Sequence, residues 1–243
     1  MLKNRVALVT NVAHFVGAAA ARAMVEEGAR VACHDRSFVD AAAAAAFAAA
    51  VPGVTTIAAS DPAEAVAETE RVMGPLDILV SNDFFPALRA AIDVANPDDL
   101  RRGLEDLVVT PFRFAGAAAA VMNPRRQGKI VFVTSAAPFH GLPNYSMYVT
   151  GRGAANALCH SLAKELASFN IQVNAVAPNY VESPSYFPPA LTQNPDAMKK
   201  FADKVPLGRL GRPEEVASAI VYLASPGADF VTGLVMPVAG GWA

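Results

Sequence analysis

Short apolar runs alternate with longer segments of helical periodicity along almost the whole chain, and this alternation limits the fold more than any other feature. The runs occupy residues 5–10, 30–34, 54–58, 76–81, 129–135, 172–177 and 233–238. Strands that are apolar on both faces and joined through helices form a parallel sheet covered on both sides. We therefore predict a single α/β domain over residues 1–243, doubly wound, with a central seven-stranded parallel sheet flanked by helices on both faces.

The segments between these runs predict helices at residues 17–27, 38–50, 62–73, 97–122, 146–169 and 213–224. Pro111 lies inside the segment 97–122 and predicts a kink or a break there, because proline lacks an amide hydrogen. Residues 179–206 are rich in proline and aromatic side chains, and a short helix is expected at 195–204. Long loops of this kind in α/β folds form lids or pocket walls.

Composition narrows the classes of function that the chain can have. Hydrophobic residues make up 53% and charged residues 17%, which supports an extensive core. A net charge of −2 gives no electrostatic case for nucleic acid or an anionic membrane, so we expect neither as a partner. Cys33 and Cys159 fall in apolar segments and predict buried, reduced thiols of a cytoplasmic protein. The N-terminus shows no secretory signal, and the alanine run at 41–50 indicates a small-residue helix rather than a membrane span.

Three polar side chains are expected to meet at one edge of the sheet. Ser135 ends a strand-like run, where open α/β sheets build their sites. Tyr148 and Arg152 lie four residues apart, so on a helix they share one face. Taken singly, Ser135 could cap a turn and Arg152 could lie on a solvated helix face. Their joint placement favours a site in which a hydroxyl, a phenol and a guanidinium converge on a small molecule.

The first strand-to-helix turn lacks the glycines of a dinucleotide-binding loop. Such a loop needs glycines so that backbone N–H groups can approach a pyrophosphate, and here Gly17 alone remains. Phe15 would fill the space of a phosphate and add an apolar wall to a pocket. The alternative is that Phe15 is a core residue at the start of the helix. Phe84, after the fourth run, adds another bulky ring. Asp35 is the contrary sign, since it can bind a ribose or, equally well, cap the next helix beside Ser37.

Several motifs resemble those of the short-chain dehydrogenase/reductase superfamily over essentially the whole chain, which implies a Rossmann-like fold. Within that superfamily, two departures resemble the halohydrin dehalogenases. A tyrosine-x-x-x-arginine pair, Tyr148 and Arg152, replaces tyrosine-x-x-x-lysine. A threonine-x4-phenylalanine-x-glycine turn, Thr10 to Gly17, replaces the glycine-rich loop. The supporting motifs are Ser135 with Tyr148, Val173-Asn-Ala-Val-Ala-Pro178, Leu207-Gly-Arg-Leu-Gly-Arg-Pro213, Ala239-Gly-Gly241, Ala32-Cys-His-Asp-Arg-Ser-Phe38, Val80-Ser-Asn-Asp83 and Pro178-Asn-Tyr180.

The resemblance implies a carbon–halide lyase that needs no cofactor and closes vicinal haloalcohols to epoxides, with release of halide and a proton. Tyr148 would take the hydroxyl proton as a phenolate, and Ser135 would donate a hydrogen bond to the substrate oxygen. A free phenol has a pKa of about 10, so the permanently cationic Arg152 would serve to favour the phenolate. In reverse, the site would open epoxides with azide, cyanide or nitrite.

The resemblance also assigns further residues and an assembly. It places the halide ion among Phe15, Pro178, Asn179, Tyr180 and Val181. Helices like those at 100–122 and 147–169 pair between subunits in the superfamily, which implies a homotetramer. We expect no metal site, because the four histidines show no ligand spacing. Substrate-pocket walls are expected from Phe84, Pro138, His140, Tyr145, Tyr186 and Phe187, although His140 also fits a surface loop.

Two other functions fit parts of the sequence. One is an NAD(P)-dependent reductase with an atypical cofactor loop, which Asp35 and the tyrosine favour. The other is a catalytically silent binding protein of the same fold, against which the intact Ser135, Tyr148 and Arg152 set argues. The natural substrate and the enantiopreference depend on the loops at 84–96 and 179–206.

Overall fold

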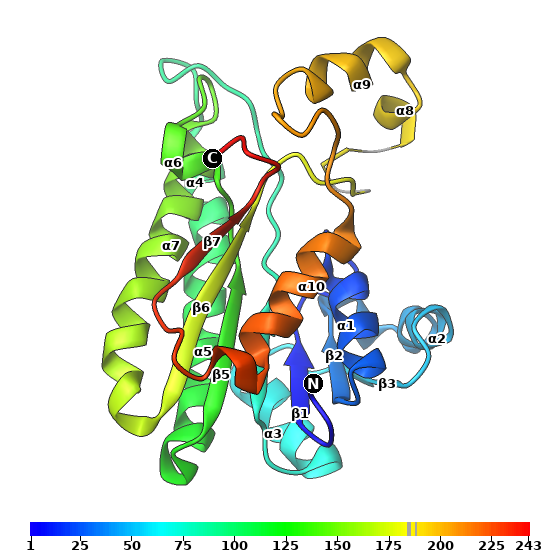
Figure 1. Ribbon diagram of the computed structural model, residues 1–243, viewed down its shortest axis with the longest axis vertical. Coiled ribbons are helices and arrows are strands. Elements are labelled where there is room, and N and C mark those ends of the chain that lie inside the picture. Colours follow the sequence, from blue (N-terminus) through cyan, green and yellow to red (C-terminus); the bar gives the residue numbers. More distant parts are fainter. Residues whose placement is uncertain (184–185, 188) are drawn as a thin grey trace.

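The computed structural model describes residues 1–183, 186–187 and 189–243, and it confirms the predicted α/β architecture (Figure 1). Seven parallel strands form one sheet in the order β3-β2-β1-β4-β5-β6-β7. The order reverses direction between β1 and β4, where doubly wound folds place their sites. The strands are β1 (Val6–Val9), β2 (Arg30–His34), β3 (Val54–Ile57), β4 (Ile78–Ser81), β5 (Gly128–Val133), β6 (Ile171–Pro178) and β7 (Val235–Val238).

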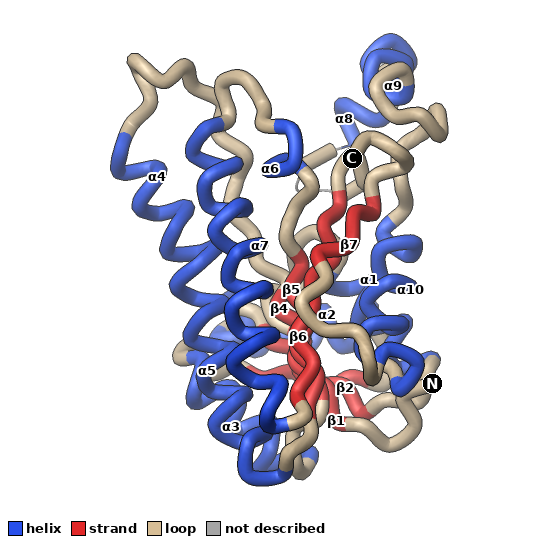
Figure 2. The backbone as a smooth tube through the Cα atoms, turned by 60° about the vertical axis from the view of Figure 1, so that its left-hand side comes forward, coloured by secondary structure: helices blue, strands red, loops and turns tan. Residues whose placement is uncertain are grey.

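Helices cover both faces of this sheet. Figure 2 shows α3, α5 and α7 on one side and α1 and α10 on the other. The helices α8 and α9 stand beyond the carboxyl ends of the strands (Figure 1). The helices are α1 (Gly17–Glu26), α2 (Ala41–Ala50), α3 (Pro62–Met73), α4 (Pro97–Leu104), α5 (Thr110–Met122), α6 (Ala137–His140), α7 (Ser146–Leu166), α8 (Pro189–Thr192), α9 (Pro195–Ala202) and α10 (Pro213–Ala224).

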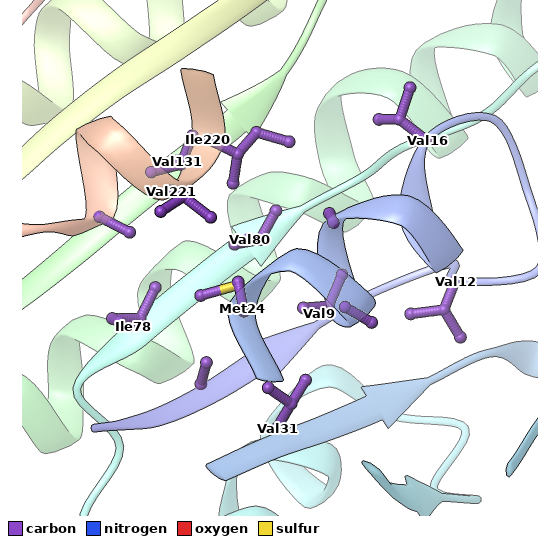
Figure 3. Close-up of a cluster of buried hydrophobic side chains, with 14 of the residues drawn as sticks. Val9, Val12, Val16, Met24, Val31, Ile78, Val80, Val131, Ile220 and Val221 are labelled. Carbon is purple, nitrogen blue, oxygen red and sulfur yellow. The ribbon is translucent and has the colours of Figure 1, made fainter. Parts of the chain in front are cut away.

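The core consists of two apolar layers, one on each face of the sheet. Successive residues of a strand point to opposite faces, so Val9 packs toward α1 and α10 while Leu8 packs toward α3 and α5. Figure 3 shows the first layer, in which Met24 of α1 and Ile220 of α10 meet the valines of the strands. Full burial of such a side chain is worth roughly 1.5–3 kcal/mol. The continuous apolar strands of the sequence are thus explained by burial on both faces.

The helical segment 97–122 is interrupted just before Pro111, where a kink or a break was predicted. It divides into α4, a π-helical turn (Glu105–Val109) and α5, whose first turn contains Pro111. Thr110 N donates to Glu105 O across the π turn, and the next residue, Pro111, needs no acceptor because it has no amide hydrogen. The widened π turn carries the chain from α4 into α5. Leu107 of that turn is buried and would lie 3.1 Å from a Cβ built on Gly151 of α7.

Two segments differ from the expectations. The short helix α6 follows β5 where a loop was expected, and the helix at 195–204 ends at Ala202. Residues 184–185 and 188 of the loop 179–206 lie outside the described residues.

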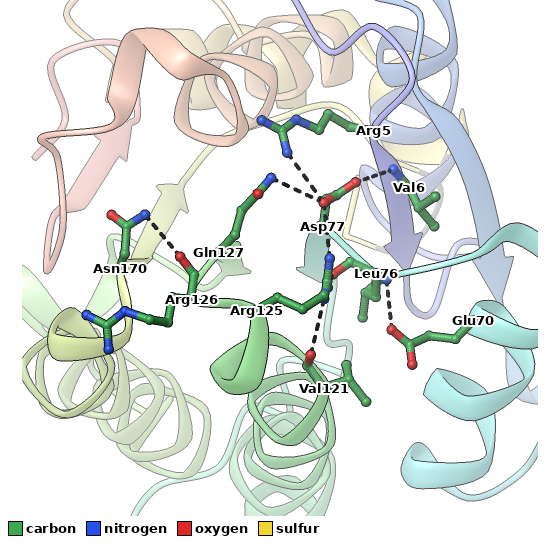
Figure 4. Close-up of polar contacts among 10 residues, drawn as sticks. All are labelled: Arg5, Val6, Glu70, Leu76, Asp77, Val121, Arg125, Arg126, Gln127 and Asn170. Carbon is green, nitrogen blue, oxygen red and sulfur yellow. Dashed lines mark hydrogen bonds and ion pairs between the residues drawn. The ribbon is translucent and has the colours of Figure 1, made fainter.

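A polar cluster closes the amino-terminal end of the sheet (Figure 4). The Asp77 carboxylate accepts hydrogen bonds from Val6 N at 3.0 Å, Arg5 Nη1 at 3.4 Å, Arg125 Nη1 at 3.5 Å and Gln127 Nε2 at 3.5 Å. The cluster therefore links the starts of β1, β4 and β5, and the candidate site can form at the opposite, carboxyl ends of the strands.

None of the helices in the described part of the chain combines the length and the hydrophobicity that crossing a bilayer requires.

Cys33 and Cys159 are buried free thiols, as the sequence predicted, and burial raises the pKa of each to about 12. At neutral pH these thiols are therefore protonated and unreactive.

Candidate active site

A cavity of about 600 Å³ opens at the carboxyl ends of the strands. It brings together Ser135 beyond β5, Tyr148 of α7 and the segment that follows β6. Leu191 of α8 and Phe201 of α9 line it as well. Among the residues that the sequence singled out, the cavity is lined by Phe15, Ser135, Tyr145, Tyr148, Pro178, Asn179, Tyr180, Val181, Tyr186 and Phe187.

Ser135 is held in place by the turn that leaves β5. Its side chain is buried, and its Oγ accepts a hydrogen bond of 3.1 Å from Ala137 N. The hydroxyl therefore caps the turn and keeps its own hydrogen free for another acceptor. The capping interpretation and the functional interpretation of Ser135 are thus compatible.

Arg152 is buried rather than on a solvated helix face, since 1% of it is exposed. Its Nη1 donates to Val133 O at 3.0 Å, and its Nη2 donates to Asp83 O at 2.9 Å and to the Tyr186 hydroxyl at 3.1 Å. The guanidinium carbon lies 5.3 Å from the centre of the Tyr148 ring. Burial acts to lower the pKa of Arg152, but the phenolic groups of Tyr148 and Tyr186 raise it above its usual range. The site thus contains a fixed positive charge beside the phenol.

Asp83 is a buried carboxyl that the sequence analysis did not single out as a site residue. Its Oδ2 accepts from Ser81 Oγ at 2.8 Å, and Asn11 Nδ2 donates to its Oδ1 at 3.4 Å. Burial raises the pKa of Asp83 to about 7, although the Ser81 hydrogen bond and the Arg152 charge act in the opposite direction. An acidic residue placed directly after an apolar strand was the signal that could have identified it.

The raised pKa of Asp83 predicts a particular dependence of stability on pH. In the unfolded chain its pKa is about 3.9, so between about pH 4 and pH 7 the native state holds more protons than the unfolded state. The contribution of Asp83 to the free energy of unfolding therefore falls as pH rises through this window. Asp83→Asn removes that fall, and urea unfolding at several pH values measures it.

Subtracting the free energy of unfolding of wild type from that of Asp83→Asn leaves the contribution of Asp83 alone. The other acidic groups with shifted pKa values contribute equally to both proteins. These groups, whose pKa values are lowered, are Asp35, Asp61 and Glu215. The stability of the Asn variant relative to wild type should rise steadily from pH 4 to pH 7. Parallel stability curves would show that Asp83 does not titrate in this range. Protein concentration is kept constant so that any assembly affects both proteins alike.

The first-turn loop is fastened by side chains from two neighbouring strands. Asn82 Nδ2 donates to Asn11 O and to His14 O, both at 2.9 Å. Asp35 accepts from Ala13 N at 3.0 Å, and also from Ser37 N at 3.0 Å and Ser37 Oγ at 2.7 Å. The capping interpretation of Asp35 is thereby confirmed. These bonds lower the pKa of Asp35, although burial alone would raise it.

Gly17 is required at the start of α1 by close packing. A Cβ on this residue would lie 2.6 Å from Val12 Cα and 2.9 Å from Asn82 Nδ2. Atoms cannot approach so closely without displacing the loop. The remaining glycine of the turn therefore serves loop packing.

Phe15 and Tyr180 face the cavity from strained positions. Their φ angles are 47° and 52°, in the left-handed region that residues with a bulky side chain seldom adopt. The Phe15 ring packs partly on the core and meets the Tyr186 ring edge-on at 5.4 Å. Both expected roles of Phe15, core packing and cavity wall, are therefore present. Strain of this kind persists where the surrounding structure requires it, often at functional sites.

Asn179 carries a buried donor at the cavity. Its Oδ1 accepts a hydrogen bond of 3.0 Å from Tyr180 N, which fixes the orientation of the amide. Its Nδ2 is buried and has no hydrogen-bond partner among the described residues. Buried donors are almost always paired, so this amide hydrogen is available to an acceptor in the cavity.

Three expected pocket walls lie elsewhere, and those assignments are corrected. Phe84 stacks on His14 with ring centres 4.6 Å apart and lines a second cavity of about 470 Å³. Pro138 faces α7, where a Cβ on Gly153 would lie 3.7 Å from it. His140 is exposed at the end of α6, and its ring meets Trp242 at 4.9 Å. Phe84 packs against Tyr186, which lines the first cavity in its place, and Pro138 and His140 belong to the unforeseen helix α6 and do not line that cavity.

The described residues contain no group of three or more histidine, cysteine, aspartate or glutamate side chains that could bind a metal ion. The tertiary structure also revealed the hydrogen bond between Tyr186 and Arg152, which no local sequence signal indicated.

Comparisons with known proteins identify a family and a relative that this chain resembles. The model of the family described as enoyl-(acyl carrier protein) reductase matches residues 12–243. A relative from Xanthobacter autotrophicus, an inactive 2-(S)-hydroxypropyl-CoM dehydrogenase, is 35% identical, with 91% of this chain and 98% of the relative covered.

Two solved structures are more similar. One, described as a dehalogenation enzyme, is 47% identical and superposes with a TM-score of 0.98 over 100% of both chains. The other is a halohydrin dehalogenase bound to ethyl (2S)-oxiran-2-ylacetate. It is 38% identical, with a TM-score of 0.93 over 97% of this chain and 96% of that chain.

Proposed function

The chain belongs to the short-chain dehydrogenase/reductase superfamily and, within it, to the halohydrin dehalogenases, and on this premise we propose that it converts vicinal haloalcohols into epoxides. The observation that carries the proposal is the unpaired buried amide of Asn179, which shares a cavity with Ser135 and Tyr148. A proton acceptor and an anion-binding donor are the two groups that this elimination requires.

In the proposed mechanism, Ser135 donates its free hydroxyl hydrogen to the substrate oxygen and holds it in position. Tyr148, as phenolate, takes the proton of the substrate hydroxyl. The oxygen then attacks the neighbouring carbon from the side opposite the halogen. The new C–O bond closes the epoxide while the C–X bond breaks, and its electron pair leaves with the halide. No hydride moves, so this chemistry requires no nicotinamide.

Arg152 supplies the charge that favours the phenolate. The buried guanidinium carbon lies 5.3 Å from the centre of the Tyr148 ring, where a positive charge is screened little by solvent. Arginine remains protonated under all ordinary conditions. It therefore acts as an electrostatic partner of Tyr148 and does not transfer the proton itself.

The halide is proposed to bind among Phe15, Pro178, Asn179, Tyr180 and Val181. Asn179 Nδ2 offers an N–H dipole, and the positive edges of the neighbouring rings add to it. These partial charges bind an anion more weakly than a cationic side chain would, so the halide can leave after each turnover. By microscopic reversibility, azide, cyanide or nitrite would bind in the same place and open an epoxide.

The assembly and location are part of the proposal. We infer a homotetramer from the likeness to the superfamily, and exposed apolar side chains such as Phe112 of α5 and Phe230 ahead of β7 support contacts between copies of the chain. We place the protein in the cytoplasm, a reducing compartment that suits two buried free thiols.

The proposed reaction is tested by adding 1,3-dichloro-2-propanol to the protein without any cofactor. We expect chloride and protons to appear in equal amounts together with an epoxide. Heat-denatured protein measures the spontaneous reaction. Absence of chloride release from several chloro- and bromoalcohols would refute the proposal, and binding of NADH, followed by its fluorescence, would instead favour the reductase.

Asn179→Asp is expected to lower halide release by about 100-fold. Aspartate keeps the oxygen that accepts from Tyr180 N but replaces the donor by a second carboxylate oxygen, which repels an anion. Initial rates of bromide release and inhibition by added bromide measure the effect, and the variant should lose the inhibition.

Asn96→Asp is the matched control, because Asn96 caps α4 and aspartate caps equally well. This control should release bromide at the wild-type rate. If Asn179→Asp retained bromide inhibition, Asn179 would not be the halide donor.

A further inference from the structure

Tyr186 stands between the proposed base and the proposed halide wall. Its ring meets the Tyr148 ring at 6.2 Å and the Phe15 ring at 5.4 Å. We propose that Tyr186 is a positioning residue that fixes the guanidinium of Arg152 against Tyr148. This assignment deepens the proposed function and rests on it.

The Tyr186 hydroxyl uses both of its hydrogen-bonding capacities. It accepts from Arg152 Nη2 at 3.1 Å and donates to Phe85 O at 3.2 Å. The carbonyl of Phe85 has no proton to give, so the direction of this chain is fixed. Tyr186 must therefore be a neutral phenol that offers its lone pair to Arg152.

The two phenols beside Arg152 thereby take different roles. One guanidinium carries one positive charge, and that charge can favour one phenolate strongly. Burial raises the pKa of Tyr186, and its proton is held by Phe85 O, so Tyr186 stays neutral. The charge of Arg152 is left to act on Tyr148, whose ring centre lies 5.3 Å from the guanidinium carbon.

The other groups that face Arg152 do not replace Tyr186. Arg152 Nη2 also donates to Asp83 O, and Nη1 donates to Val133 O, but both acceptors are backbone carbonyls, at the end of β5 for Val133 and just past β4 for Asp83. The Asp83 carboxyl interacts with Arg152 and, further out, with Asp106 and Arg36. Tyr186 alone among these partners also lines the cavity that contains Tyr148.

The Tyr186 ring is held independently of its hydroxyl. Phe15 and Phe84 pack against it with ring centres 5.4 Å away in both cases. Tyr186→Phe therefore keeps the ring contacts and removes the hydrogen bonds of the hydroxyl to Arg152 and to Phe85 O. That substitution separates positioning from packing.

The test follows tyrosinate formation by ultraviolet difference absorbance, which needs no substrate. The chain has five tyrosines, and Tyr148→Phe identifies the transition that belongs to Tyr148. In Tyr186→Phe, we expect the pH midpoint of that transition to move up by about one unit, because the guanidinium is no longer fixed near the phenolate. Tyr222→Phe, an exposed tyrosine of α10, is the matched control and should leave the midpoint unchanged.

Kinetics supply the second readout. For a haloalcohol, the pH midpoint of kcat should move upward in Tyr186→Phe by the same amount, while KM stays within about twofold of wild type. An unchanged tyrosinate midpoint would overturn the proposal. So would a lower kcat at all pH values without a shift, or a variant that no longer melts cooperatively, since both indicate a structural role. If Tyr186→Phe shifted the tyrosinate midpoint but the wild-type protein released no halide, the proposed reaction would be refuted and the positioning role would remain.

Discussion

Tyr148→Phe is expected to release halide from a haloalcohol about 1,000-fold more slowly than the wild-type chain. The phenol is the group proposed to take the hydroxyl proton, and phenylalanine fills the same space without an oxygen. Without that acceptor the substrate alcohol must ionise unaided, so the effect should be on kcat rather than on KM. Initial rates of bromide release at neutral pH measure it.

The fold of this variant should be unaffected, and its thermal unfolding should resemble that of wild type. Tyr222→Phe provides the same chemical change on α10, at a residue that does not line the cavity, and should retain full activity. If Tyr148→Phe released halide as fast as wild type, dehalogenation would still stand, but Tyr148 would not be the base.

Arg152→Lys should reduce halide release by about 100-fold, even though it preserves the charge and restores the tyrosine-x-x-x-lysine pair that is usual in the superfamily. The guanidinium reaches Val133 O, Asp83 O and the Tyr186 hydroxyl from two nitrogens. A single ammonium cannot occupy both positions, so at least one buried acceptor loses its partner. That loss should lower the free energy of unfolding by roughly 1–3 kcal/mol.

Arg101→Lys is the control for this substitution. Arg101 is exposed on α4 and pairs with Asp98 through a surface contact at 2.5 Å, a kind of pair that contributes little to stability. The control should match wild type in both activity and urea unfolding. If Arg152→Lys released halide at the wild-type rate, a positive charge alone would be sufficient for activity, without the two-nitrogen geometry of the guanidinium.

The fold could be predicted because its signal is local. Apolar strands such as 129–135 and the spacing of helix starts and glycine ends determine a parallel sheet before any contact is known. The π-helical turn at Glu105–Val109 could not be predicted, because it depends on how α4 and α5 pack against α7. The helix α6 was missed because it spans four residues, too few for a periodic pattern.

In the candidate site, too, local patterns in the sequence identified some residues, and contacts between distant parts of the chain determined the rest. Tyr148 and Arg152 were found through their spacing on one helix, and Ser135 through its place after a strand. The backbone oxygen of Asp83 and the hydroxyl of Tyr186 both bind Arg152, from 69 and 34 positions away, so no local pattern indicated those two contacts. The expected walls Phe84, Pro138 and His140 failed for a related reason, since the path of a loop or of α6 decides which side chains reach the cavity.

The hydrogen bonds that hold the first-turn loop have a consequence for the redesign of this protein. Asp35, the acid that could have recognised a ribose, is bound to the loop backbone at Ala13, and Asn82 binds the same loop from β4's end. Asp35 is therefore not free to bind a ribose, and a smaller residue in place of Phe15 would leave all of these hydrogen bonds intact. A variant designed to bind a dinucleotide at this turn would have to change Phe15 together with Asp35 and Asn82.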